Sequence, residues 1–175
     1  MIKADLILKN AIVLTMDHNF NQFDPGAIVV KGNSILAVGS EEQILQEYTA
    51  DQQMDCGGKV VMPGLINAHT HVPMTLLRGL ADDLRLDVWL MGYMMPVERE
   101  FVSPDFVTLG TRLACAEMIK SGVTTFADMY YFEEDIAKAT AEIGMRALCA
   151  QTILKFPTPD AQFYEQSLEM ARNFM

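Results

Sequence analysis

The hydrophobic pattern changes its period near Gly64, and this change constrains the fold more than any other feature of the sequence. Before it, short apolar segments follow one another with turn residues between them. After it, continuously apolar segments alternate with segments of helical period. Strands separated by helices usually pair in parallel and are buried on both faces. The pattern therefore predicts an α/β region preceded by a small β-unit.

Residues 1–62 are predicted to form the β-unit. Two apolar segments are expected around Lys9-Asn10, and two more on either side of a turn at Gly32-Asn33. Residues 40–50 predict a short helix, because Ser40 is a good N-cap and acidic residues follow in the first turn. The chain then returns to a strand and a turn before Gly64.

Residues 63–175 predict three successive strand–helix units. The expected strands cover 65–69, 123–129 and 146–154, and the expected helices cover 103–122, 133–144 and 160–175. The first helix is clearly marked by Ser103 as N-cap, Pro104 at the first helical position and Gly122 at its end. Residues 72–102 form a long insertion after the first strand. Because such connections build the active sites of strand–helix barrels, we expect this insertion to contact substrate.

Charge and composition exclude several partners. The 175 residues are 50% hydrophobic and 21% charged, as in a globular protein with a core. The net charge of −10 would repel phosphate backbones and anionic lipids, so we expect neither nucleic acid nor a membrane as partner. No signal-like or membrane-spanning apolar run is present, which favours the cytoplasm. Cys56, Cys115 and Cys149 are expected to be reduced, packed thiols.

Two of the three histidines stand one residue apart at the end of the first strand of the α/β region. Side chains two residues apart on a strand point to the same face, so His69 and His71 should project together while Thr70 points away. Neutral imidazole is a good ligand for zinc and similar divalent ions. The spacing alone predicts either two metal ligands or a hydrogen-bonded pair in a polar pocket. His18 is expected in a surface turn.

The residues around this pair resemble a known family. The segment PGLINAHTH, 63–71, is similar to the first-strand signature of the amidohydrolase superfamily, in which a β-sandwich runs into a metal-bearing (β/α)8 barrel. The segments HVPMTLLRGLADDLRLDVWL and SGVTTFADMY resemble those of enzymes that deaminate S-adenosylhomocysteine and 5'-methylthioadenosine, and of related chlorotriazine hydrolases. The resemblance implies that residues 1–62 are part of a composite β-sandwich domain. It also implies that residues 63–175 are the first three βα units of a TIM barrel.

The function that the resemblance implies is a zinc-dependent hydrolase acting on carbon–nitrogen bonds other than peptide bonds. Its substrate would be a small molecule, either purine nucleoside-like or a heteroaromatic amine. His69 and His71 would be ligands of one divalent ion, zinc or another metal. Trp89 and Glu98 match a tryptophan and a glutamate that face the nucleoside in the deaminases. The residues themselves also allow core packing for Trp89 and a solvent-facing position for Glu98.

The same resemblance implies that the chain is the N-terminal part of a larger enzyme. Catalytic zinc commonly has three protein ligands, and a complete barrel takes about 250 residues. The family's later ligands and its proton-shuttling glutamate have no counterpart after His71. We therefore expect no catalytic residue here and an inactive chain when it stands alone. Uncovered strand and helix faces should make it unstable or self-associating.

Three functions remain open on the sequence: a deaminase, a chlorotriazine-type or other cyclic-substrate amidohydrolase, and a non-catalytic fragment. If the short chain held a metal by itself, further ligands would have to come from Asp82, Asp83, Glu98 or Asp128. Asp128 ends the second strand of the α/β region with no identified partner. The native metal and the oligomeric state, a homo-oligomer included, stay open.

Overall fold

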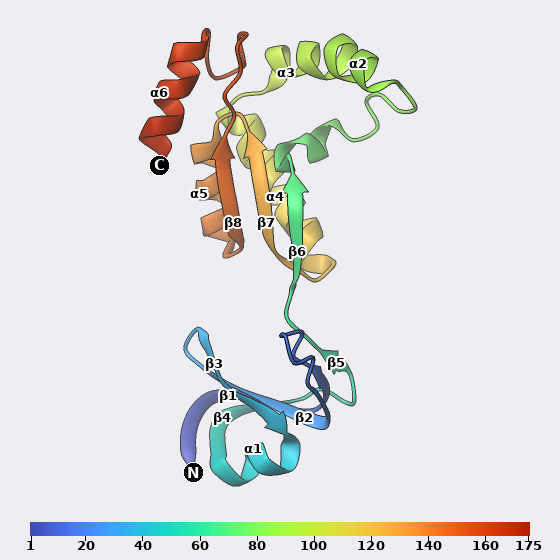
Figure 1. Cartoon of the computed structure of the whole chain (residues 1–175), viewed down its shortest axis with the longest axis vertical. Coiled ribbons are helices and arrows are strands. Elements are labelled where there is room, and N and C mark those ends of the chain that lie inside the picture. Colours follow the sequence, from blue (N-terminus) through green and yellow to red (C-terminus); the bar gives the residue numbers. More distant parts are fainter. The chain divides into compact units, whose positions relative to one another are not determined.

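The structure is a computed structural model that describes all residues, 1–175. The chain divides into two compact units, Met1–Pro63 and Gly64–Met175 (Figure 1). No helix is long and apolar enough to cross a membrane. All three cysteines are free, as expected.

The first unit is a twisted sheet with one short helix. Its strands are β1 (Ile2–Leu14), β2 (Gln22–Lys31), β3 (Ser34–Ser40), β4 (Tyr48–Asp55) and β5 (Val60–Val61). They are ordered β3-β2-β1-β4, with β5 also paired to β1. The first three strands are antiparallel neighbours, whereas β4 and β5 run parallel to β1. Helix α1 (Glu41–Glu47) contributes Ile44 to a core formed mainly by β1 and β2.

The structure confirms the turn at Gly32-Asn33 and the helix that follows Ser40, and it corrects two other expectations. Strand β1 is one continuous strand, with a register irregularity beside Asn10, whose φ is 53°. The helix ends at Glu47, and Tyr48 begins a strand that the sequence did not predict. Strand β4 forms because the N-terminal half of β1 offers backbone groups for parallel pairing. Its last five residues are exposed and four of them are polar, so no hydrophobic pattern marks them.

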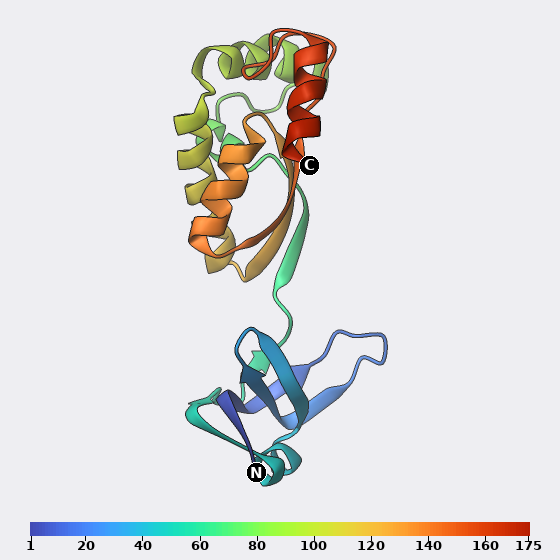
Figure 2. The same cartoon turned by 90° about the vertical axis from the view of Figure 1, so that its left-hand side faces the viewer.

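The second unit is a parallel sheet with helices on one side. Its strands are β6 (Leu65–Thr70), β7 (Val123–Tyr130) and β8 (Arg146–Gln151), in the order β6-β7-β8. Its long helices are α4 (Pro104–Lys120), α5 (Glu133–Ile143) and α6 (Tyr164–Phe174). Figure 2 shows α4 and α5 together on one side of the strands. Phe126 of β7, Val107 of α4 and Ile136 of α5 form the centre of the core between them.

The strand–helix order and the parallel pairing are confirmed, but burial on both faces is wrong. Ile66 and Leu148 on the sheet are each 71% exposed, because no layer of this unit covers that face. Exposed apolar surface was expected, and it is present. Strand β8 also ends before Thr152, and residues 152–163 form a loop. Its two prolines lack backbone N–H donors and restrict the residues before them, which disfavours both strand and helix.

The insertion after β6 is helical in short pieces. It contains the 3-10 helix η1 (Val72–Leu77), the single turn α2 (Leu86–Val88), the π-helix η2 (Trp89–Met94) and α3 (Met95–Phe101). Gly110 of α4 lets η1 approach closely, since a Cβ there would lie 2.7 Å from the Cα and the carbonyl oxygen of Pro73. Helix α4 therefore fixes the segment that directly follows His71.

Candidate metal and substrate site

His71 directly follows β6, and a hydrogen bond to the neighbouring strand orients its ring. Its Nδ1 lies 2.6 Å from the carbonyl oxygen of Met129 on β7. Because a carbonyl only accepts, Nδ1 carries the proton and donates, and Nε2 keeps a free lone pair. The ring of His69 lies 5.3 Å from that of His71, at 76° to it. A histidine whose Nδ1–H is held by a carbonyl is the usual form of a metal-binding imidazole.

The two histidines fit as part of a metal site. Neutral imidazoles are suitable zinc ligands, and the hydrogen bond to Met129 fixes the tautomer that one of them needs. No group of three or more His, Cys, Asp or Glu side chains in the chain could hold a metal ion. Since catalytic zinc commonly has three protein ligands, the chain offers a partial ligand set. Asp82 and Asp83 are exposed, and His18 lies exposed in a turn, as expected.

A cavity of about 250 Å³ brings three of the predicted site residues together. His71, Trp89 and Glu98 line it, and His69 does not. Most of the remaining lining consists of methionine, leucine and aromatic side chains. Trp89 is only half-buried, and its ring belongs to the cavity wall. An apolar cavity with a few polar groups is typical of small-molecule sites.

Glu98 reaches this cavity from α3 and is held by two tyrosines. The Tyr130 hydroxyl donates to Glu98 Oε1 over 2.8 Å, and the Tyr131 hydroxyl donates to Oε2 over 3.3 Å. Glu98 is 5% exposed, so the solvent-facing alternative is wrong. Burial raises the pKa of Glu98, and the two tyrosine hydrogen bonds oppose that rise.

No partner for Asp128 could be identified from the sequence, and the structure supplies two. Its Oδ1 lies 2.6 Å from the Thr70 hydroxyl oxygen and accepts from the Val72 backbone N–H over 2.8 Å. The side chain is 4% exposed, and burial raises its pKa. Thr70 and Asp128 are register partners on β6 and β7. Only the register between β6 and β7 could have predicted this contact. The sequence gives the order of the strands but not their register.

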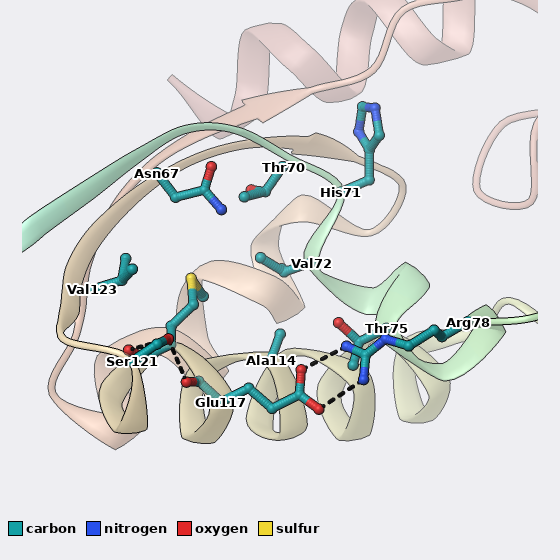
Figure 3. Close-up of a pocket in the computed structure, with 11 residues that line it drawn as sticks. Asn67, Thr70, His71, Val72, Thr75, Arg78, Ala114, Glu117, Ser121 and Val123 are labelled. Carbon is teal, nitrogen blue, oxygen red and sulfur yellow. Dashed lines mark hydrogen bonds and ion pairs between the residues drawn. The ribbon is translucent and has the colours of Figure 1, made fainter.

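A second groove, of about 380 Å³, lies on the other side of His71, between β6, η1 and α4. Figure 3 shows the His71 ring turned away from the ion pair at its rim. In that pair, Arg78 donates to both oxygens of Glu117 over 3.0 and 2.6 Å. The hydrogen bond from Arg78 lowers the pKa of Glu117. Both side chains are largely exposed, so we assign this pair the modest role of holding η1 against α4.

Two solved structures resemble this chain in fold. The mixed α/β fold of this chain matches that of these two zinc-containing enzymes. The adenosine deaminase of Xanthomonas campestris, solved with bound zinc, matches with a TM-score of 0.93 and 35% identity over 98% of this chain and 39% of that one. A second match, in fold alone, is a mutant atrazine chlorohydrolase of Arthrobacter aurescens solved with zinc and atraton. Its TM-score is 0.82 at 20% identity, over 97% of this chain and 42% of the chlorohydrolase chain.

The chain belongs to the Amidohydrolase family, which residues 60–174 match. A 5-methylthioadenosine/S-adenosylhomocysteine deaminase of Syntrophobacter fumaroxidans is 47% identical over 99% of this chain. The match covers 39% of that relative, so the chain spans well under half the length of the relatives it resembles. The family resemblance inferred from the sequence is therefore confirmed.

Proposed function

We propose that this chain carries the N-terminal part of a zinc-dependent aminohydrolase that deaminates adenosine-like substrates. 5'-Methylthioadenosine and S-adenosylhomocysteine are the first candidates. The observation that carries the proposal is the cavity in which His71, Trp89 and Glu98 meet. The 47% identity to a deaminase supports the choice of substrate class.

In this proposal, residues 1–62 are part of a small β-sandwich, and residues 63–175 are the first three βα units of a metal-dependent hydrolase TIM barrel. The insertion 72–102 forms one wall of the substrate site. The uncovered sheet face, where Ile66 and Leu148 are exposed, supports this assignment, because in a barrel that face is filled by side chains of further strands.

Each site residue has a separate role. His69 and His71 would hold the metal ion, and that ion would lower the pKa of a water molecule toward neutrality. Trp89 offers an aromatic face to the base. Glu98, pinned by Tyr130 and Tyr131, accepts hydrogen bonds from ribose hydroxyls, and the apolar wall accommodates the 5'-substituent. The group that protonates the leaving amine lies outside these residues.

A cytoplasmic location is part of this proposal, and the three free cysteines support it because they suit a reducing compartment. Its partner is a small molecule, and the net charge of −10 disfavours nucleic acid.

The test uses an extended protein, in which this chain is followed by the part of the Syntrophobacter fumaroxidans relative that lies beyond the match. We expect one zinc ion per chain and ammonia release from 5'-methylthioadenosine or S-adenosylhomocysteine. His71→Ala should lose both, and His18→Ala, at the exposed turn, is the matched control. Atrazine, with chloride release as the readout, tests the chlorohydrolase alternative.

A cooperative melting curve shows first that the extended protein is folded. A folded protein that bound no zinc and released no ammonia would refute the proposal and favour a non-catalytic role. The 175-residue chain alone is expected to be inactive in the same assays, because its ligand set is partial.

A further inference from the structure

Three contacts from the end of β7 hold His71 and its two neighbours. Oδ1 of Asp128 lies 2.6 Å from the hydroxyl oxygen of Thr70, which precedes His71. The same oxygen accepts from the backbone N–H of Val72, which follows it, over 2.8 Å. The next residue of β7, Met129, accepts a hydrogen bond from Nδ1 of the His71 ring through its carbonyl oxygen. One strand end thus fixes both the backbone around His71 and the direction of its ring.

The contact through Val72 is the firmer of the two that Asp128 makes. A backbone N–H has one proton and a fixed direction, and here it points at a carboxylate oxygen. The Thr70 hydroxyl also has one proton, but two acceptors are in reach, Asp128 Oδ1 and the Ala127 carbonyl at 2.8 Å. Hydrogen bonds to an ionised acceptor are shorter and stronger than neutral ones, which suits a carboxylate in this position.

Burial keeps these contacts free from competing water. Asp128 is 4% exposed and Val72 is also 4% exposed. The helical segment η1 begins at Val72, and α4 holds η1 in place through the close contact at Gly110. His71 therefore stands at a junction that is fixed on one side by β7 and on the other by α4.

We propose that Asp128 is a positioning residue, which orients His71 for metal binding by acting through Val72 and Thr70. This inference rests on the proposed function, because it assumes that His71 is a metal ligand. Partners that orient a metal-binding histidine typically change metal affinity by about 10- to 100-fold when they are removed. Asp128 does not touch the metal or the substrate in this role.

The experiment measures the zinc dissociation constant of the extended protein by competition with a chelator. Asp128→Ala removes the acceptor and should weaken zinc binding by about 10- to 100-fold. Asp128→Asn keeps an acceptor oxygen and should stay closer to the unsubstituted protein than to Asp128→Ala. Thr111→Val is the matched control, because it removes a fully buried hydroxyl of the same unit that has no hydrogen-bond partner. Its zinc affinity should not change.

A second readout follows the ring itself. In the metal-free extended protein, the ¹⁵N shifts of His71 should indicate an Nδ1–H tautomer for the unsubstituted protein and for Asp128→Asn. Asp128→Ala should show a mixture of tautomers, since the ring is no longer aligned with the Met129 carbonyl. A role limited to stability would leave these shifts unchanged.

Two results would overturn the inference: equal zinc affinity in Asp128→Ala and the unsubstituted protein, or equal losses in Asp128→Ala and Asp128→Asn. If Asp128→Ala does not fold, Asp128→Leu replaces it, since leucine fills a similar volume without an acceptor for the Val72 N–H. Weaker zinc binding in Asp128→Leu than in Asp128→Asn supports the inference, and equal binding in the two refutes it. An unsubstituted protein that binds no zinc refutes the proposed function itself.

Discussion

At the scale of single residues, the buried carboxyl groups carry the clearest consequences. Glu133, at the start of α5, is fully buried, and only its Oε2 accepts from a backbone N–H, that of Tyr130, over 3.1 Å. Its Oε1 has no partner. Burial, and then the nearby charge of Asp128, raise the pKa of Glu133 to about 8. The folded chain therefore holds a proton on this side chain at neutral pH.

Stability should consequently fall as the pH rises toward 8. The pKa of Glu133 rises on folding from its ordinary value of 4.5 to about 8, so the folded state binds the extra proton between these values. The contribution is complete below the unfolded pKa and is lost as the pH rises through the folded pKa, at up to about 1.4 kcal/mol per pH unit. Melting temperatures of the extended protein between pH 5 and pH 8 measure it. Glu133→Gln should flatten the profile, and parallel profiles for the two proteins would contradict this account.

The tyrosine pair makes a second prediction at this scale. Tyr130→Phe removes the 2.8 Å hydrogen bond that holds Glu98 Oε1. A hydrogen bond to a charged group contributes about 1.5–3 kcal/mol, so the KM for a nucleoside substrate should rise by about 10- to 100-fold, with a smaller change in kcat. Tyr93→Phe is the control, because Tyr93 is 45% exposed and does not line the cavity. Equal KM values for the two variants would show that the hydrogen bond from Tyr130 to Glu98 does not contribute to substrate binding.

At the scale of elements, local signals were predictable and long-range pairing was not. Helix α4 begins where Ser103 and Pro104 predict, with the Ser103 hydroxyl accepting from Phe106 N over 3.3 Å. Strand β4 was missed because pairing with β1, and not its own composition, makes it a strand. The same distinction applies to the site. The His69 and His71 pair follows from the two-residue period of a strand, whereas its contacts to β7 depend on a register between segments 58 residues apart.

The packing of η1 on α4 gives a prediction for an element. Gly110→Ala places a Cβ 2.7 Å from the backbone of Pro73, so it should destabilise the extended protein by about 1–3 kcal/mol and weaken zinc binding by displacing the segment after His71. Gly92→Ala, in η2, meets nothing within 4 Å. It should be neutral or stabilising by up to about 1 kcal/mol, as is usual for this exchange within a helix. Urea denaturation compares the two, and equal unfolding free energies would refute the packing argument.

At the scale of the whole molecule, two apolar surfaces of the second unit have no cover within it. One is the sheet face with Ile66 and Leu148, each 71% exposed. The other is the outer side of α4, where Leu109 is 60% and Leu113 is 41% exposed. Large apolar side chains exposed on the faces of a sheet and a helix are characteristic of interfaces or of aggregation-prone proteins.

The 175-residue chain by itself should therefore self-associate or melt without cooperativity. Sedimentation velocity over a range of concentrations measures this, and Leu148→Lys should shift the distribution toward monomer by charging the open face. Lys138→Glu, on α5, is a control for a change of charge elsewhere in the unit. A monomeric chain that melts cooperatively would show that the exposed faces are tolerated.

The parallel sheet also sets an order of assembly. Asp128 pairs with Cys149 across 21 residues, but it meets Thr70 across 58, and closing the longer loop costs about 0.9 kcal/mol more in chain entropy. Strands β7 and β8 should thus join first, and β6 should dock onto them afterwards. During refolding, amide protons of β8 should become protected from exchange before that of Val72. The histidine pair would then be aligned only after the surface that orients it has formed.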